Sequence, residues 1–278
     1  MGSHYFVDRF SPFVIQFYDG WGIRYYSLAY IIGFFSVYWG MLKFRRWGWS
    51  SLNADEVADL FVWVVLGTLI GGRLAYCFVY ELPKTLADPL WIIAFWRTGG
   101  IAGMASHGGM AGIILCAILY CRRHGKNWRE VLDNLSMLST IGIFLGRMAN
   151  FINGELWGRP STVPWAVIFP DAPLVNGLMV PRHPSQLYEG LGEGLILGTA
   201  LFLLRCAGVK GGRIAVCYLV GYAVIRMSLE CFREPDSQIG FLFWGVTMGQ
   251  LLSVFILIGA VVLWRCRDQD KKHSISSS

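Results

Sequence analysis

Hydrophobic residues along this chain are gathered into runs of about 20 residues, and short polar or charged segments separate the runs. A run of this length can cross the hydrocarbon core of a bilayer as an α-helix, whereas a helix on the surface of a soluble protein carries only an apolar stripe. The pattern predicts seven membrane-spanning helices. They cover about residues 23–42, 57–80, 101–121, 131–151, 185–205, 213–232 and 244–264.

Polar residues predict where two of these helices begin and what lies between the others. Asn53 followed by Glu56 has the spacing of a capping box, and Ser185 opens the fifth run. The Pro-rich stretch before Ser185 predicts a small extramembrane head at about residues 158–184, while residues 1–22 and 81–100 read as interfacial arms. The predicted fold class is therefore an all-α polytopic membrane protein, with seven transmembrane helices in a single domain over residues 1–267 and a polar, disordered tail over residues 268–278.

Composition and charge support this prediction and add an orientation. The chain is 55% hydrophobic and 15% charged, whereas a soluble domain is nearer a quarter charged. Basic residues cluster after the first, third, fifth and seventh runs, which places them on one side of a seven-span protein. They are Lys43, Arg45, Arg46, Arg122, Arg123, Lys126, Arg129, Arg205, Lys210, Arg213, Arg265, Arg267, Lys271 and Lys272. By the positive-inside rule this side is cytoplasmic, so the N-terminus is expected outside and the C-terminus inside. The net charge of +6 then reflects topology and anionic lipid, and predicts no nucleic-acid partner.

Several common kinds of site lack their sequence marks. The seven cysteines form no CxxC, and the five histidines form no HxxxH or HxH pair, so neither a disulfide framework nor a metal site is indicated. The P-loop, GxSxG and HExxH patterns do not occur either. We therefore expect no metal and no cofactor.

The segment GRMANFINGELWGR, residues 146–159, gathers polar and charged residues directly after an apolar run. A charged side chain at bilayer depth costs about 2.5–3.5 kcal/mol on insertion scales, so it usually faces a protein interior or a polar cavity. Glycine and asparagine tolerate left-handed backbone and suit a broken helix end. A polar loop leaving a helix is the alternative interpretation for any one of these residues, although it explains the whole cluster less well.

Three further clusters fall on the outer side of the predicted topology. His107 lies in a glycine-rich SHGG segment, where it could act as a base or merely hydrogen bond between packed helices. Glu189 and Glu193 are four residues apart and therefore share a helix face, which we do not expect to face lipid. Outside the three clusters, Tyr26 opens the first run on the same side, where a tyrosine is most often an interfacial anchor.

The third cluster, Arg226, Glu230 and Arg233, has the i, i+4, i+7 spacing of one helical stripe. An Arg–Glu pair within a helix can be purely structural. Arg147 and Arg226, however, both fall near the outer ends of different predicted helices. Because a guanidinium matches the geometry of phosphate oxygens, we expect the two arginines to converge as a phosphate clamp at headgroup depth.

Taken in order, these motifs resemble the bacterial prolipoprotein diacylglyceryl transferases. The resemblance runs from about Tyr26 through SHGG, GRMANFINGELWGR, RHPSQLYEG and FREPD to the end of the seventh run. It implies a multi-pass enzyme of the bacterial inner membrane with its active site toward the periplasm. The implied reaction transfers the diacylglyceryl group of phosphatidylglycerol to the lipobox cysteine of a prolipoprotein signal peptide and releases glycerol phosphate, as the first step of lipoprotein maturation. We expect a monomer whose only other partners are membrane lipids.

The resemblance also implies functional positions. The expected catalytic residues are His107, Arg147, Arg226, Glu230, Tyr26 and Glu155, and the expected phosphatidylglycerol-binding residues are Arg147, Asn150, Asn153, Gly154, Arg226, Tyr222 and Arg233. His107 is the first candidate for the base that takes the thiol proton, with Glu155, Glu230 and Tyr26 as alternatives. Glu155 and Glu230 are expected to hold the arginines in place.

Two other classes of function are weighed against this one. A lipid or anion transporter would also collect arginines at headgroup depth, but it would carry polar residues along a whole path, and the cytoplasmic halves of these runs carry almost none. A membrane-embedded assembly factor would explain glycine-rich packing but not a histidine together with two arginines.

Overall fold

The computed structural model describes residues 5–18, 21–93, 103–235 and 245–276, and these are mainly helical. They form two compact units, residues 1–37 with 135–278 and residues 38–134, whose boundaries fall inside two of the helices. Each unit is described by itself.

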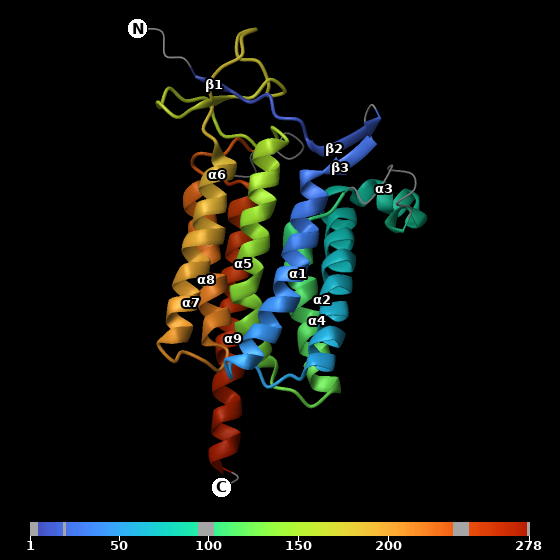
Figure 1. Cartoon of the computed structure of the whole chain (residues 1–278), viewed down its shortest axis with the longest axis vertical. Coiled ribbons are helices and arrows are strands. Elements are labelled where there is room, and N and C mark those ends of the chain that lie inside the picture. The colour runs from blue at the N-terminus through green and yellow to red at the C-terminus, as the bar shows by residue number, and fades with distance from the viewer. Residues whose placement is uncertain (1–4, 19–20, 94–102, 236–244, 277–278) are drawn as a thin grey trace. The chain divides into compact units, whose positions relative to one another are not determined.

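Helices occupy all seven of the predicted ranges within the described residues (Figure 1). They are α1 (Tyr25–Arg46), α2 (Ala54–Ala75) continued by η1 (Tyr76–Tyr80), α4 (Ser106–Arg123), α5 (Trp128–Ile152), α6 (Ser185–Glu189) continued by η4 (Gly190–Ile196) and α7 (Leu197–Cys206), α8 (Arg213–Leu229) and α9 (Met248–Ser276). Five of the described helical stretches are long and apolar enough to cross a membrane. These are Tyr25–Arg46, Ala54–Tyr80, Trp128–Ile152, Ser185–Cys206 and Met248–Arg265.

Both predicted helix starts are confirmed, although only α2 has a side-chain capping hydrogen bond at its start. The Asn53 side chain accepts a hydrogen bond from the Glu56 amide at 2.9 Å, and the Glu56 carboxylate accepts one from the Asn53 amide at 2.9 Å. These two bonds form the expected capping box. α6 begins at Ser185, but the Ser185 hydroxyl donates to the carbonyl oxygen of Leu156 and so ties the helix to the segment after α5.

In the unit of residues 38–134, α2 and α4 pack at glycine contact. Gly67 and Gly71 on α2 face Gly112 and Gly108 on α4. A Cβ atom at Gly67 would lie 2.6 Å from the Gly112 carbonyl oxygen, and one at Gly108 would overlap the carbonyl oxygen of Gly71. Small residues at every fourth position allow helix backbones to approach closely, so Gly108 and Gly112, near His107, serve helix packing.

Arg73 anchors the excursion that follows α2 in the same unit. Its guanidinium donates to the carbonyl oxygens of Ile92 at 2.9 Å and Gly103 at 3.3 Å, and it lies over the ring of Trp91. The excursion contains α3 (Leu82–Ala87) and η2 (Pro89–Ile92). Residues 94–102, most of which belong to the predicted interfacial arm of residues 81–100, lie outside the described residues.

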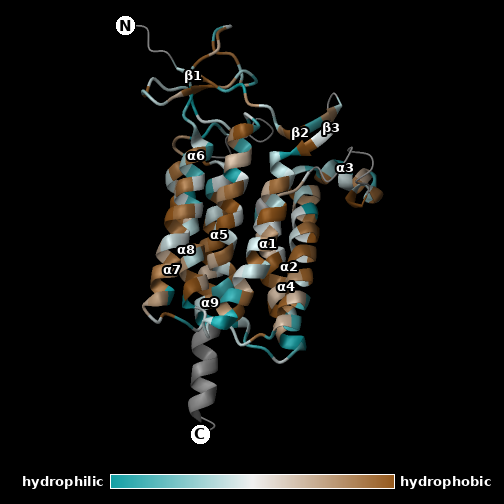
Figure 2. Ribbon diagram, in the orientation of Figure 1, coloured by the Kyte–Doolittle hydropathy of each residue, from teal (hydrophilic) through white to brown (hydrophobic). Residues whose placement is uncertain are grey.

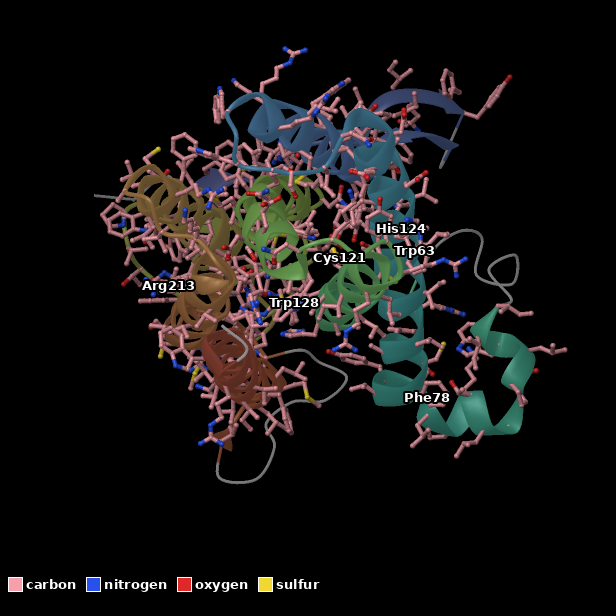
Figure 3. The ribbon with its side chains drawn as sticks, turned by 90° about the horizontal axis from the view of Figure 1, so that it is seen from below. Trp63, Phe78, Cys121, His124, Trp128 and Arg213 are labelled. Atoms are coloured by element: carbon pink, nitrogen blue, oxygen red, sulfur yellow. The ribbon has the colours of Figure 1, made fainter. Side chains whose placement is uncertain are left out.

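At the opposite, N-terminal end of α2, the aromatic side chain of Tyr120 packs against this helix. The Tyr120 hydroxyl donates to the Glu56 carbonyl oxygen at 3.0 Å, and the Tyr120 ring stacks on His124 and meets the edge of Trp63. Figure 3 labels Trp63 and His124 at this end. The contacts tie the end of α4 to the first turns of α2.

In the other unit, α5, the α6–α7 segment, α8 and α9 form a helical bundle, and Figure 2 shows hydrophobic residues along the shafts of α7 and α8. Glycines again set the spacing, since a Cβ at Gly194 would lie 2.6 Å from the Phe144 side chain. Beyond the helices, β1 (Phe6–Val7) pairs in parallel with β4 (Val167–Ile168), and β2 (Phe13–Tyr18) pairs antiparallel with β3 (Trp21–Arg24). Val167, Phe169 and Ala172 make a small core with Phe151 and Trp157.

Two details differ from the sequence prediction. The N-terminal arm contributes short strands, so the fold is mainly but not wholly helical. The segment after Arg265, expected to be disordered from residue 268, instead continues α9 to Ser276. It contains neither glycine nor proline, so no residue in it interrupts the helix.

The glycine contact between α2 and α4 can be tested with adjacent residues. Gly108→Ala should lower the apparent melting temperature in detergent, because overpacking costs about 1–3 kcal/mol. Gly109→Ala is the matched control, since its Cβ would meet only ordinary contact with Thr68 at 3.4 Å. Equal melting temperatures for the two variants would contradict the close approach.

Candidate functional site

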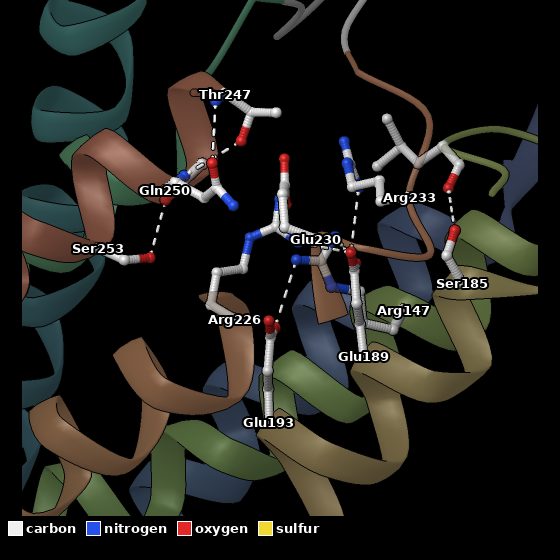
Figure 4. Close-up of polar contacts among 12 residues, drawn as sticks. Arg147, Ser185, Glu189, Glu193, Arg226, Glu230, Arg233, Thr247, Gln250 and Ser253 are labelled. Atoms are coloured by element: carbon white, nitrogen blue, oxygen red, sulfur yellow. Dashed lines mark hydrogen bonds and ion pairs between the residues drawn. The ribbon is translucent and has the colours of Figure 1, made fainter. Parts of the chain in front are cut away.

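Six charged side chains meet at one end of the bundle in the unit that contains α5 to α9 (Figure 4). Arg147 comes from the last turns of α5, Glu189 from the end of α6 and Glu193 from η4. Arg226 lies in the last turn of α8, and Glu230 and Arg233 follow the end of that helix. We call these six residues the arginine–glutamate cluster.

Glu189 is the centre of the cluster. One carboxylate oxygen accepts from Arg226 at 2.6 Å and from Arg233 at 3.3 Å, while the other lies 2.9 Å from Arg147. The Glu189 side chain has no exposed surface. Three arginines from two distant parts of the sequence therefore converge on a single buried carboxylate.

Two more carboxylates complete the cluster. Glu193 lies 3.3 Å from Arg147. Glu230 lies 3.1 Å from Arg226, which precedes it by one helical turn. The three arginines and three glutamates balance in formal charge. Among the arginines, the Arg147 side chain is 16% exposed, compared with 7% for Arg226 and 6% for Arg233.

Burying these charges is costly, and their mutual attraction offsets the cost only while the set is complete. Removing one partner of a buried ion pair costs about 3–5 kcal/mol, whereas apolar residues of similar volume are often neutral or better. Stability alone therefore gives no reason to place six charges at this point. An arrangement of this kind is typical of a functional site.

The start of α9 closes one side of the cluster. Thr247 and Gln250 cap this helix through reciprocal bonds between side chain and backbone amide, at 3.3 and 3.1 Å. Between them, Gly249 faces the ion pair of Arg226 and Glu230. A Cβ at Gly249 would lie 2.9–3.0 Å from the Glu230 carboxylate oxygens and 3.1 Å from the Arg226 guanidinium.

The central motif turns sharply after α5, as its glycines and asparagines predicted. Gly154 has φ of 62° and Leu156 has φ of 59°, and the second value is strained for a leucine. Asn150 donates to the Glu155 carboxylate at 2.7 Å, and the buried Gln186 donates to the Glu155 carbonyl oxygen at 2.6 Å. These bonds hold the turn against the start of α6.

The segment after the turn is tied to the cluster through Arg233. Arg159 donates to the Arg233 carbonyl oxygen at 3.0 Å, while the Arg233 side chain reaches Glu189. Arg182 is buried and donates to the carbonyl oxygens of Gly158 at 3.2 Å and Pro173 at 2.9 Å. Arg182 therefore stabilises the segment of residues 158–184 from within, and the bond from Arg159 to Arg233 joins this segment to the cluster.

The predicted convergence of Arg147 and Arg226 is confirmed, because both contact Glu189. Arg233 joins them, although α8 ends at Leu229 and the residue is not on the predicted helical stripe. Glu230 holds Arg226 as expected. Glu155 does not match its expected role, since its carboxylate accepts from Asn150. The carboxylates that hold Arg147 are instead those of Glu189 and Glu193.

The remaining predicted residues lie around or apart from the cluster. Tyr222 is buried on α8, one turn before Arg226. Tyr26 is half-buried at the start of α1, where its ring lies 5.3 Å from that of Tyr30. Asn153 has a buried side-chain oxygen with no hydrogen-bond partner among the described residues. His107 belongs to the other unit, in the first turn of α4.

Glu189 and Glu193 were not among the predicted site residues. Their four-residue spacing on a face not expected to meet lipid was the available signal. That spacing places both carboxylates on the same side of a helix, but it does not reveal the arginines opposite them.

Comparisons with known proteins agree with the motif resemblance. A family model described as prolipoprotein diacylglyceryl transferase matches residues 12–266. The chain is 44% identical over 247 residues to the phosphatidylglycerol–prolipoprotein diacylglyceryl transferase of Rhodospirillum rubrum, covering 87% of each chain. Proteins of the same name are 43% identical in Zymomonas mobilis, covering 87% of this chain and 82% of the relative, and 39% identical in Legionella pneumophila, covering 87% and 91%.

Gly249 gives a test of how tightly the cluster is packed. Gly249→Ala should lower the apparent melting temperature, because the new methyl group would displace the Arg226–Glu230 pair or shift α9. Gly259→Ala on the same helix has open space around it and should be neutral or slightly stabilising, since alanine favours helix by about 1 kcal/mol over glycine. A Gly249→Ala protein as stable as Gly259→Ala would show that α9 does not close the cluster.

Proposed function

Because the chain belongs to the prolipoprotein diacylglyceryl transferase family, we infer that it transfers the diacylglyceryl group of phosphatidylglycerol to the lipobox cysteine of prolipoproteins. The product is a thioether-linked lipid, and glycerol phosphate is released. The structural observation that supports this function best is the convergence of Arg147, Arg226 and Arg233 at one end of a membrane-protein bundle.

For this reaction the enzyme has to stabilise the charge of the leaving group, but it need not supply a nucleophile. The substrate thiol forms a bond to an sp3 carbon of the lipid as the carbon–oxygen bond to phosphate breaks, so no cysteine of the enzyme takes part. Negative charge grows on the leaving phosphate group. We propose that Arg147 and Arg226 bind this group, since preorganised cations in a site of low dielectric constant stabilise such charge strongly.

The thiol proton needs an acceptor, because a thiol of pKa about 8.5 is mostly protonated at pH 7 while the thiolate is the reactive form. We propose His107 as this base, on the ground that imidazole titrates near neutrality. Glu155, Glu230 and Tyr26 are the alternative bases.

The other predicted residues are assigned to lipid binding. Asn150, in the last turn of α5, and Asn153 and Gly154, in the turn after it, would bind the glycerol or phosphate oxygens. The unpartnered oxygen of Asn153 suits a hydroxyl donor. Tyr222 and Arg233 would line the same site from α8 and the turn after it.

We also propose the full topology and setting. α4 and α8 would cross the bilayer as the third and sixth of seven spans in one domain, with residues 158–184 as a periplasmic head and the basic connections in the cytoplasm. The protein would reside in the bacterial inner membrane as a monomer with its active site toward the periplasm. The alternation of basic connections along the chain supports this orientation.

Arginine substitutions test the proposed clamp. Arg147→Ala and Arg226→Ala should each abolish transfer from phosphatidylglycerol to a lipobox peptide, measured as the gain of one diacylglyceryl mass on the peptide and the release of glycerol phosphate. Arg213→Ala, an exposed arginine at the opposite end of α8, is the matched control and should retain full activity. Normal turnover in either the Arg147→Ala or the Arg226→Ala variant would contradict the proposal that these arginines bind the phosphate group. Detergent-purified protein also separates the enzyme from a lipid transporter, which needs a sealed bilayer.

Topology can be tested with single cysteines and an impermeant thiol reagent, in a variant freed of its natural cysteines. A cysteine replacing Asp171 should be labelled in spheroplasts with an intact membrane, whereas one replacing Lys126 or Lys210 should be labelled only after lysis. Labelling of Lys126→Cys in intact spheroplasts would contradict the seven-span orientation.

A further inference from the structure

We propose that Glu193 is a positioning residue that holds Arg147 in the lipid-free enzyme and gives this arginine up when the phosphate group of phosphatidylglycerol binds. The inference rests on the proposed function, and it gives a role to a buried carboxylate that the transfer reaction itself does not require.

The formal charge of the cluster is the first reason. Three arginines face three glutamates at 2.6–3.3 Å, so the arginines are already matched by negative charge before any lipid arrives. A phosphodiester adds one more negative charge beside three carboxylates. Like charges at this distance repel strongly in a site of low dielectric constant, so the lipid phosphate needs an arginine that can change partners.

Arg147 is the arginine best placed to make this exchange. Its side chain is 16% exposed, more than twice the value for either Arg226 or Arg233. Arg147 also contacts two different carboxylates through separate guanidinium nitrogens. One nitrogen can therefore turn to a phosphate oxygen while the other stays on Glu189.

Glu193 is the carboxylate whose contact is easiest to replace. It lies 3.3 Å from Arg147, whereas Glu189 lies 2.9 Å from the same side chain. Among the described residues, Arg147 is the cation that Glu193 contacts, through the carboxylate oxygen Oε2. The other carboxylate oxygen of Glu193, Oε1, is buried and has no hydrogen-bond partner among the described residues. Glu189 keeps Arg226 and Arg233 in any case, and Glu230 is held one helical turn from Arg226.

The exchange has a direct consequence for affinity. As long as Glu193 is ionised it competes with the lipid phosphate for Arg147, so the lipid-free state is stabilised relative to the lipid-bound state. Removing the negative charge of Glu193 should therefore tighten lipid binding, whereas removing a residue that only supports the fold would weaken it or leave it unchanged.

The test uses two variants of Glu193 in the full-length purified protein. Glu193→Gln keeps the shape and removes the charge, so it should lower both the KM for phosphatidylglycerol and the dissociation constant of dispersed short-chain phosphatidylglycerol by about tenfold, the ratio expected for loss of one competing charged hydrogen bond. Glu193→Asp keeps the charge but withdraws it by one methylene group, and should give an intermediate decrease. Glu234→Gln, on a glutamate whose side chain is 41% exposed and pairs with Arg182, is the matched control and should change neither constant.

The outcomes separate this inference from the proposed function. An unchanged or weaker affinity in a folded Glu193→Gln protein would overturn the role of Glu193, even if transfer by the unsubstituted protein is normal. If the Gln variant does not fold, Glu193→Asp decides in the same way, because its affinity must still rise. Absence of transfer by the unsubstituted protein would instead reject the proposed function, and the equilibrium binding constants would still test the exchange at Arg147.

Discussion

The site depends on the ion pairs that the Glu189 carboxylate makes with Arg147, Arg226 and Arg233. This side chain has no exposed surface and holds the three arginines together. Without it, three positive charges would lie side by side in a site from which water is largely excluded. Such an arrangement would repel itself by several kcal/mol, on the order of the whole stability of a domain. Ion pairs to Glu189 therefore help to place α5, α6 and the end of α8 relative to one another.

The helices meet this constraint through close contact at small residues. Gly190, Gly194 and Gly249 allow the elements around the cluster to approach, and a Cβ at any of them would come within 3.0 Å of a neighbouring side chain. In a membrane, helix association gains little from the hydrophobic effect, so such close packing and interhelical polar bonds carry much of it. The charged cluster and the glycine contacts therefore support each other.

The turn after α5 shows how local strain and function coincide. Leu156 is held at φ of 59° by bonds that come from α6, where Ser185 and Gln186 donate to the backbone of the turn. The turn also carries Glu155, whose carboxylate accepts from Asn150 at the end of α5 that holds Arg147. Strain of this kind persists where the surrounding bonds are strong enough to maintain it.

Much of this protein follows from its sequence alone. Apolar run length located the helices, the Asn53–Glu56 spacing located a helix start, and the order of the motifs indicated the family, because each of these signals is local. Apart from Glu230, which lies one helical turn after Arg226, the partners of the arginines could not be found in this way. Helical spacing places Glu189 and Glu193 on one face, but only the tertiary structure decides that Arg147 and Arg226 lie opposite that face and that Glu155 instead binds Asn150. Contacts between residues some 40 positions apart depend on how helices pack, and no local pattern encodes that.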